Sequence, residues 1–131
     1  ATSGVKYGLF CSTPMVAVSR NLPRKAAMEM LLTGDFIDAQ TALRLGLVNQ
    51  VVPAAALDAA VDRLCARLLD KPADVLALGK RAFYRQLEMG LEEAYRFTTE
   101  VIVENALGAS FAEGVRAFVE KRQPVWPQAA E

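Results

Sequence analysis

The segment 28–53, MEMLLTGDFIDAQTALRLGLVNQVVP, contains four separate signals that start or stop a helix. Gly34 and Gly46 supply the left-handed backbone conformation that ends a helix, and Pro53 removes a backbone donor. Asp38 can accept hydrogen bonds from the amides two and three residues later, which caps a new helix. The sequence therefore predicts a fixed connector between longer helices, made of short helical turns and then an extended strand, over 39–45 and 47–52.

Apolar residues at helical spacing, with proline at several helix starts, predict helices along most of the remaining chain. A capping box from Ser110 to Glu113 marks the start of the last one. In the helix before it, we expect an inward face made of Leu91, Ala94, Tyr95, Thr98 and Ile102. The fold class is thus mainly α with a few short strands. The expected helices are a short one over 14–20 and longer ones over 23–33, 57–68, 73–87, 91–107 and 111–122.

Composition removes several classes of chemistry. Fifteen basic and fifteen acidic residues give no net charge, so we expect neither nucleic acid nor an anionic membrane surface as a partner. The absence of histidine excludes a Ser-His-Asp or Cys-His nucleophile and an HExxH zinc site. Two isolated cysteines, Cys11 and Cys65, cannot close a structural zinc site, so we expect no metal.

The chain begins with Ala1 rather than Met, and its first residues, ATSGVKYG, do not form a signal peptide. We therefore expect a chain that is processed or cut from something longer. Nothing in the cysteine content indicates an oxidising compartment, so we expect a cytoplasmic location.

Two motifs in order carry a resemblance that covers essentially the whole chain. The motif nearer the C-terminus is EGVRAFVEKR, over Glu113–Arg122. It is similar to the closing E-G-x-x-A-F-x-E-K-R of the crotonase family, the enoyl-CoA hydratases and isomerases. The other motif comes earlier in the chain, over 32–51, and resembles the family's LTG-x-x-x-x-A-x-x-A-x-x-x-G-L-V-x-x-V. The matching residues are Leu32, Thr33, Gly34, Ala39, Ala42, Gly46, Leu47, Val48 and Val51.

The resemblance extends only to the C-terminal half of such a protein. It implies the helical end of an α/β fold built on a ββα spiral. Residues 1–53 would form the end of that core, and residues 54–131 a helical assembly region. It also implies an acyl-CoA thioester as substrate with no tightly bound cofactor, a role in fatty acid metabolism, and a homo-oligomer, a trimer or hexamer.

Position 4 departs from the family pattern. When the chain is aligned on Gly8, Gly4 falls where the hydratases carry their second catalytic glutamate. A hydratase needs a pair of carboxylates to activate water and to handle the proton at Cα, and glycine does neither. No catalytic residue is therefore assigned in this chain, and restoring an acid at position 4 is expected to raise hydratase activity in a complete protein.

Other polar residues are candidates for the same chemistry. Asp38 is explained by its capping role, with Asp35 close to it in sequence. Lys6 and Tyr7 lie beside Gly4 and could face an acyl pocket. The remaining candidates are expected on solvent-exposed helix surfaces or helix ends: Glu92, Glu93, Glu100 and Glu104.

The resemblance also implies a binding position in the last helix. Phe118 and Lys121 match family positions that help to hold the nucleotide end of coenzyme A. Three residues apart, they are expected on one helical face, where lysine meets a phosphate and the aromatic ring packs beside adenine. The alternative is that Phe118 belongs to the core and Lys121 is a solvated charge.

Two functions stay open. The first is an acyl-CoA-binding protein of the crotonase family, a lyase or isomerase when complete, whose hydratase activity is in doubt because of Gly4. The chain alone would then not be an enzyme. The second is a non-catalytic helical oligomerisation module.

Overall fold

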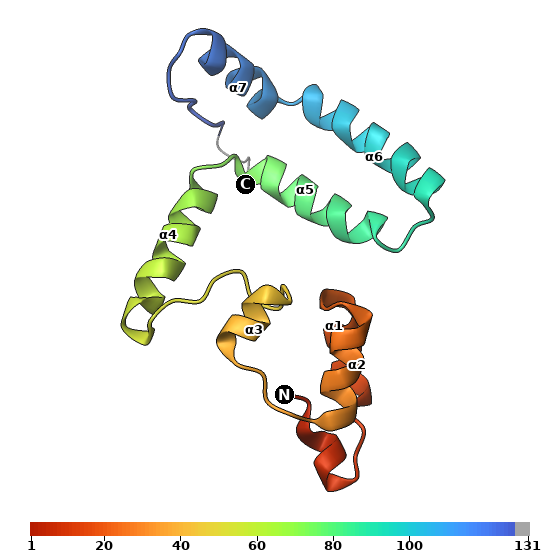
Figure 1. Cartoon of the computed structure of the whole chain (residues 1–131). Helices are drawn as coiled ribbons and strands as arrows, with labels where there is room; N and C mark the ends of the chain where they lie inside the picture. Colours follow the sequence, from red (N-terminus) through yellow and green to blue (C-terminus); the bar gives the residue numbers. More distant parts are fainter. Residues whose placement is uncertain (128–131) are drawn as a thin grey trace. The chain divides into compact units, whose positions relative to one another are not determined.

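The computed structural model describes residues 1–127, and these form helices and connecting segments without a strand (Figure 1). The chain divides into two compact units, Ala1–Leu57 and Asp58–Glu131. The predicted mainly α fold is confirmed. In chain order the elements are η1 (Ser3–Tyr7), α1 (Ser12–Asn21), α2 (Arg24–Thr33), α3 (Ala39–Arg44), η2 (Ala54–Ala56), α4 (Leu57–Leu69), α5 (Ala73–Gln86), α6 (Leu91–Ala106) and α7 (Ala109–Val119).

The connector after α2 follows the sequence prediction except for its strand. Gly34 and Gly46 have left-handed backbones, with φ of 65° and 79°. The Asp38 carboxylate accepts from the amide of Thr41 at 2.6 Å and so caps α3. Residues 47–53 contain no strand, because a strand needs a hydrogen-bonded neighbour and residues 1–127 provide none.

The first unit is held together by α2. Its core is a cluster of Leu22, Ala27 and Met30, with Val18, Ile37 and Leu45 packed on it. The buried Thr2 hydroxyl donates to the carbonyl of Met30 at 2.8 Å and ties the start of the chain to α2. At the same end of α2, a Cβ on Gly34 would lie 2.9 Å from Val5 Cγ1, so only glycine allows η1 to approach this closely.

The second unit contains two packed helix pairs, α5 with α6 and α6 with α7. The Arg85 guanidinium lies 4.4 Å from the centre of the Phe97 ring, a cation–π contact between α5 and α6. Ser110, which is 3% exposed, donates through its hydroxyl to the Asp74 carboxylate at 2.9 Å and joins α7 to the first turn of α5.

Two helix starts differ from the sequence prediction. The first helix begins at Ser12 after Cys11, and Pro14 lies inside its first turn, where a missing amide breaks no helical bond. The capping box at Ser110 does not form. Helix α7 begins at Ala109, two residues before its predicted start, because the Ser110 side chain is bound to Asp74 and Glu113 is bound elsewhere.

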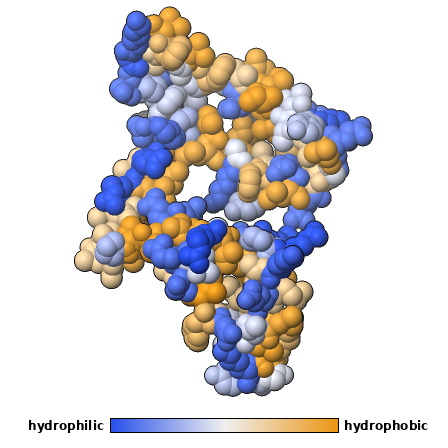
Figure 2. Space-filling view, viewed as in Figure 1, coloured by the Kyte–Doolittle hydropathy of each residue, from blue (hydrophilic) through white to orange (hydrophobic). Residues whose placement is uncertain are grey.

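Large apolar side chains are exposed in both units (Figure 2). The predicted inward face of α6 is only partly confirmed within this chain. Ala94 and Thr98 are half-buried, but Leu91, Tyr95 and Ile102 are 62–76% exposed. On α2, Leu31 is buried but Leu32 is open. No helix among residues 1–127 combines the length and apolar character needed to cross a bilayer.

Candidate functional site

The segment around Gly4 leaves no space for a side chain. Gly4 lies in η1, and its carbonyl accepts from the amide of Leu9 at 3.0 Å. A Cβ built on Gly4 would stand 2.6 Å from the Leu9 carbonyl oxygen and 2.7 Å from Cys11 Sγ. Real Cβ atoms do not approach other atoms this closely, and a backbone oxygen cannot turn aside as a flexible side chain does. Position 4 therefore lacks an acid and, in this conformation, cannot hold one.

Lys6 and Tyr7, which follow shortly after Gly4 in the sequence, do not gather around a common site. The Lys6 ammonium lies 2.8 Å from Asp35 Oδ1, so one ion pair takes up both the lysine and one of the candidate carboxylates. Tyr7 is 85% exposed. An exposed pair of this kind contributes little to stability, and its visible effect is to hold η1 near the end of α2.

The other candidate carboxylates have structural or solvated positions. The hydrogen bond from the Thr41 amide lowers the pKa of Asp38 below its ordinary value, as expected for a helix cap. On α6, Glu92, Glu93, Glu100 and Glu104 are exposed. Within residues 1–127, no three cysteine or acidic side chains come close enough to hold a metal ion.

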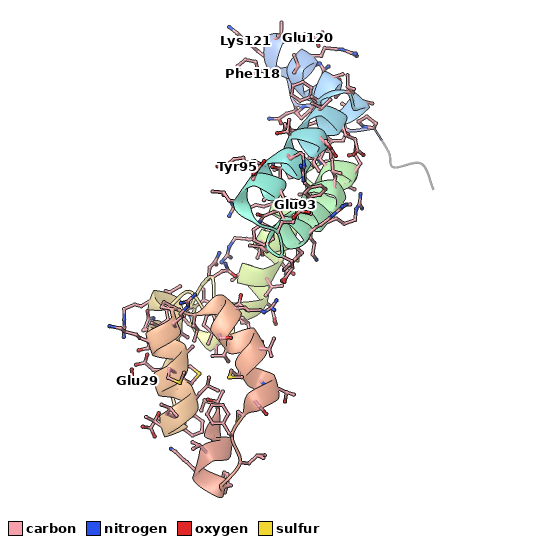
Figure 3. The ribbon with its side chains drawn as sticks, turned by 90° about the vertical axis from the view of Figure 1, so that its right-hand side faces the viewer. Glu29, Glu93, Tyr95, Phe118, Glu120 and Lys121 are labelled. Carbon is pink, nitrogen blue, oxygen red and sulfur yellow. The ribbon has the colours of Figure 1, made fainter. Side chains whose placement is uncertain are left out.

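Phe118 and Lys121 lie together, but not on one helical face. Helix α7 ends at Val119, and the next residues form a turn in which the amide of Arg122 donates to the carbonyl of Ala117 at 3.0 Å. Lys121 has a φ of 54°, the left-handed conformation that closes such a turn. The predicted helical relation is therefore wrong for Lys121. In this turn the amide of Lys121 donates to the carbonyl of Phe118 at 3.3 Å, and both residues lie at the end of α7 (Figure 3).

Both side chains are open. Phe118 is 84% exposed, so it is not a core residue of this chain. Lys121 is exposed, and its ammonium has no carboxylate partner within residues 1–127. An exposed aromatic ring and an unpaired ammonium at one turn can meet a ligand that has both a flat ring and a negative charge.

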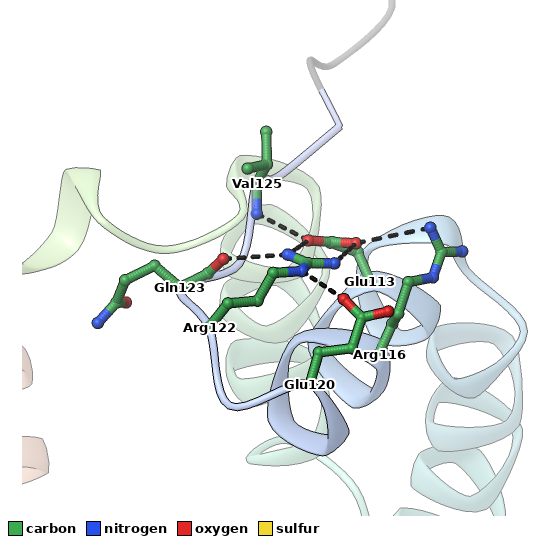
Figure 4. A network of polar contacts seen from close by, with 6 residues as sticks. All are labelled: Glu113, Arg116, Glu120, Arg122, Gln123 and Val125. Atoms are coloured by element: carbon green, nitrogen blue, oxygen red, sulfur yellow. Dashed lines mark hydrogen bonds and ion pairs between the residues drawn. The ribbon is translucent and has the colours of Figure 1, made fainter.

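A polar network behind this turn was not anticipated from the sequence (Figure 4). Arg122 makes two parallel contacts with Glu113, at 2.6 and 3.1 Å, and its Nε lies 2.5 Å from Glu120 Oε2. Glu113 also accepts from the amide of Val125 at 2.8 Å. These donors, Arg122 first, lower the pKa of Glu113 to about 2, and the two carboxylates raise the pKa of Arg122. The network could not be predicted from sequence spacing, because Glu113 also fits the capping box expected from Ser110 to Glu113.

The network continues into the last described residues. The Trp126 indole donates to the carbonyl of Asp70 at 2.8 Å, and its ring lies against Gly114, where a Cβ would be 3.6 Å away. Trp126 and Phe118 are on the wall of one apolar cavity of about 340 Å³, whose other lining residues are Pro72, Val75, Asn105, Ser110, Phe111, Gly114 and Val115.

Comparison with known proteins gives consistent matches. The sequence model of the enoyl-CoA hydratase/isomerase family matches residues 1–129. Enoyl-CoA hydratase domain-containing protein 3, mitochondrial, from Xenopus laevis is 48% identical over 96% of this chain and 43% of the relative. Carnitinyl-CoA dehydratase from Citrobacter koseri is 36% identical over 80% of this chain and 42% of the relative.

Solved structures agree with these matches. An enoyl-CoA hydratase from Mycobacterium smegmatis superposes with a TM-score of 0.93 at 49% identity, covering 96% of this chain and 49% of that chain. Human enoyl coenzyme A hydratase domain-containing protein 3 superposes with a TM-score of 0.91 at 47% identity. The match covers 96% of this chain and 50% of that chain. The chain thus spans less than half the length of the curated relatives it matches, as the resemblance to a C-terminal half implied.

One prediction is corrected by these matches. The Xenopus, mouse and human relatives are named as mitochondrial proteins, which points away from the expected cytoplasmic location. A low cysteine content does not distinguish the cytoplasm from other reducing compartments. The match over residues 1–129 and the close structural agreement together establish that this chain belongs to the enoyl-CoA hydratase/isomerase family, also called the crotonase family.

Proposed function

We propose that this chain is the part of an acyl-CoA-binding protein that holds the nucleotide end of coenzyme A at the end of α7. The observation that carries the proposal is the pairing of an exposed Phe118 ring with an unpaired Lys121 ammonium at one turn. Lysine binds phosphate as a compact point charge, and an aromatic ring offers a flat apolar surface to a base.

The proposed reaction of the complete protein is that of a lyase or isomerase acting on an acyl-CoA thioester, other than efficient hydration of an enoyl-CoA. Position 4 has no carboxylate and no space for one. Two positioned carboxylates are needed to activate water and transfer the proton. Residues 1–127 contain no other carboxylate placed for this chemistry, so the chain by itself is not expected to be an enzyme. The thioester enters as substrate, without a resident cofactor.

Titration of coenzyme A into the complete protein, followed by calorimetry at two salt concentrations, tests the binding proposal. We expect Lys121→Ala to weaken binding by about tenfold or more, the order expected for one hydrogen bond to a charged group. The loss should shrink at high salt, because screening already weakens the contact. Lys80→Ala removes the same charge from the exposed surface of α5 and serves as the matched control.

Three outcomes would contradict the proposal. Lys121→Ala could leave both the affinity and its salt dependence unchanged, or the unmodified protein could fail to bind coenzyme A at millimolar concentration. Equal losses in Lys121→Ala and Lys80→Ala would reduce the effect to overall charge.

A second candidate function is a helical oligomerisation module, and a separate feature of α4 favours it. Leu57, Val61, Leu64 and Leu68 follow one another at helical spacing, and each is 43–56% exposed. Among the described helices, α4 belongs to none of the closely packed pairs. A row of open apolar side chains is typical of an interface. A trimer or hexamer, as the family resemblance implies, is proposed in either case.

The two functions differ in a simple observation on the complete protein. Specific binding of coenzyme A that depends on Lys121 supports the acyl-CoA function. Self-association that leaves coenzyme A unbound supports the module.

A further inference from the structure

The turn that presents Lys121 has a backbone conformation that lysine does not favour. At a φ of 54° the Cβ of an L-residue is crowded by its own carbonyl, which is why glycine is the usual residue at this position of a helix end. Such a conformation persists only where the surroundings hold it in place. Contacts around the turn must therefore hold Lys121 in this conformation.

The surrounding contacts converge on Glu113. This carboxylate receives two hydrogen bonds from the Arg122 guanidinium and one from the backbone amide of Val125. Arg122 also donates to Glu120 Oε2 and, at 3.0 Å, to the carbonyl of Gln123. The residues on both sides of Lys121 are thus fixed to one another, and Glu113 fixes them to the middle of α7 (Figure 4).

The same contacts distinguish Arg122 from the neighbouring cation Lys121. Arg122 is engaged by two carboxylates, and Arg116 lies 3.9 Å from Glu113 as well. Lys121 has no acidic partner within the described part of the chain. The positive charge that remains available to an incoming anion at this turn is therefore that of Lys121, rather than that of Arg122.

We infer that Glu113 is a positioning residue for the coenzyme A site: through Arg122 it holds the turn that places the Lys121 ammonium beside the Phe118 ring. This inference rests on the proposed function. Glu113 does not touch the ligand in this arrangement. Its effect on binding passes through Lys121, and it keeps Arg122 out of the site.

A double-mutant cycle in the complete protein tests this dependence. Coenzyme A is titrated by calorimetry, at two salt concentrations, into the unmodified protein, Glu113→Gln, Lys121→Ala and the double variant. We expect Glu113→Gln to weaken binding by about three- to tenfold and to reduce its salt dependence, as Lys121→Ala does. In the Lys121→Ala background, Glu113→Gln should cause no further loss.

A matched control separates positioning from general stability. Asp38→Ala removes the cap of α3, in the other unit of the chain, and destabilises the protein without touching the turn. It should leave the affinity for coenzyme A unchanged. If Glu113→Gln fails to fold, Arg122→Gln replaces it in the same cycle, because it leaves the bond between Val125 and Glu113 in place.

The possible results distinguish a failure of this inference from a failure of the proposed function. Unchanged affinity in Glu113→Gln, or losses that add independently in the double variant, would overturn the inference while Lys121→Ala still supports the function. Equal weakening by Asp38→Ala would also overturn it. If Lys121→Ala itself binds coenzyme A normally, the proposed function fails.

Discussion

Gly4 lies so close to the carbonyl oxygen of Leu9 that a single added methyl carbon would stand 2.6 Å from it. The position that the family resemblance assigns to a catalytic glutamate is thus not an empty place left by a lost side chain. The turn from Gly4 to Leu9 and the Cys11 thiol fill the space that such a side chain would occupy. The structure therefore reverses the expectation that an acid restored at position 4 raises hydratase activity.

Gly4→Glu is expected to lower the free energy of unfolding by roughly 1–3 kcal/mol, as overpacking does, because the Leu9 backbone has to move. It should give no gain in the hydration of a short enoyl-CoA by the complete protein. Chemical denaturation and a spectrophotometric hydratase assay measure the two effects.

The matched control for Gly4→Glu is Gly79→Ala in α5. A Cβ at Gly79 would meet nothing within 4 Å, so this change should stabilise the helix by about 0.5–1 kcal/mol. A Gly4→Glu protein that is as stable as the unmodified one and hydrates the substrate would refute the steric explanation.

Lys121→Gly is expected to separate stability from binding. Glycine adopts the left-handed conformation freely, so Lys121→Gly should be more stable than Lys121→Ala by about 1 kcal/mol. Both variants lose the ammonium and should lose affinity for coenzyme A equally. Thermal unfolding and calorimetric titration provide the comparison, and equal stability of the two variants would show that position 121 carries no backbone strain.

The attachment of Val125 and Trp126 is expected to depend on pH through Glu113. Its pKa is about 2 in the folded chain, below the ordinary 4.5. A lowered pKa means that the contribution of Glu113 to stability is complete above about pH 4.5 and is lost as the pH falls towards 2. Trp126 is the single tryptophan and reports on this segment. Its fluorescence emission should shift to longer wavelength over this range.

Glu113→Gln is the control for the acid transition. It should remove the Glu113-dependent part of the fluorescence change and leave the emission nearer the acid form at neutral pH. Circular dichroism at the same pH values distinguishes release of the segment from loss of the helices. An unchanged acid transition in Glu113→Gln would show that another group holds Trp126.

The open row on α4 predicts concentration-dependent self-association. Leu64→Glu introduces a charge into the middle of the row and should shift the protein towards a smaller species in sedimentation experiments. Arg63→Glu changes the charge on the other face of the helix and should have little effect. An unmodified protein that sediments as a monomer at high concentration, with no change on dilution, would contradict the proposed interface.

Several features could be predicted from the sequence because their causes are local. A left-handed glycine at Gly34, the cap at Asp38 and the helix after Pro72 each depend on a few neighbouring residues, and each lies where the pattern indicated. The apolar spacing indicated the helices for the same reason. The ordered motifs also identified the family, since they record many such local constraints together.

The sequence by itself thus determined a mainly helical chain of the crotonase family and the absence of an acid at position 4. The tertiary structure decided what surrounds each of these residues. It showed that Leu9 and Cys11 close the space at Gly4, that Ser110 binds Asp74 instead of capping α7, and that Glu113 holds Arg122. These contacts are not made along one face of a single helix or strand. They arise when the backbone folds back on itself, and a local pattern carries no record of them.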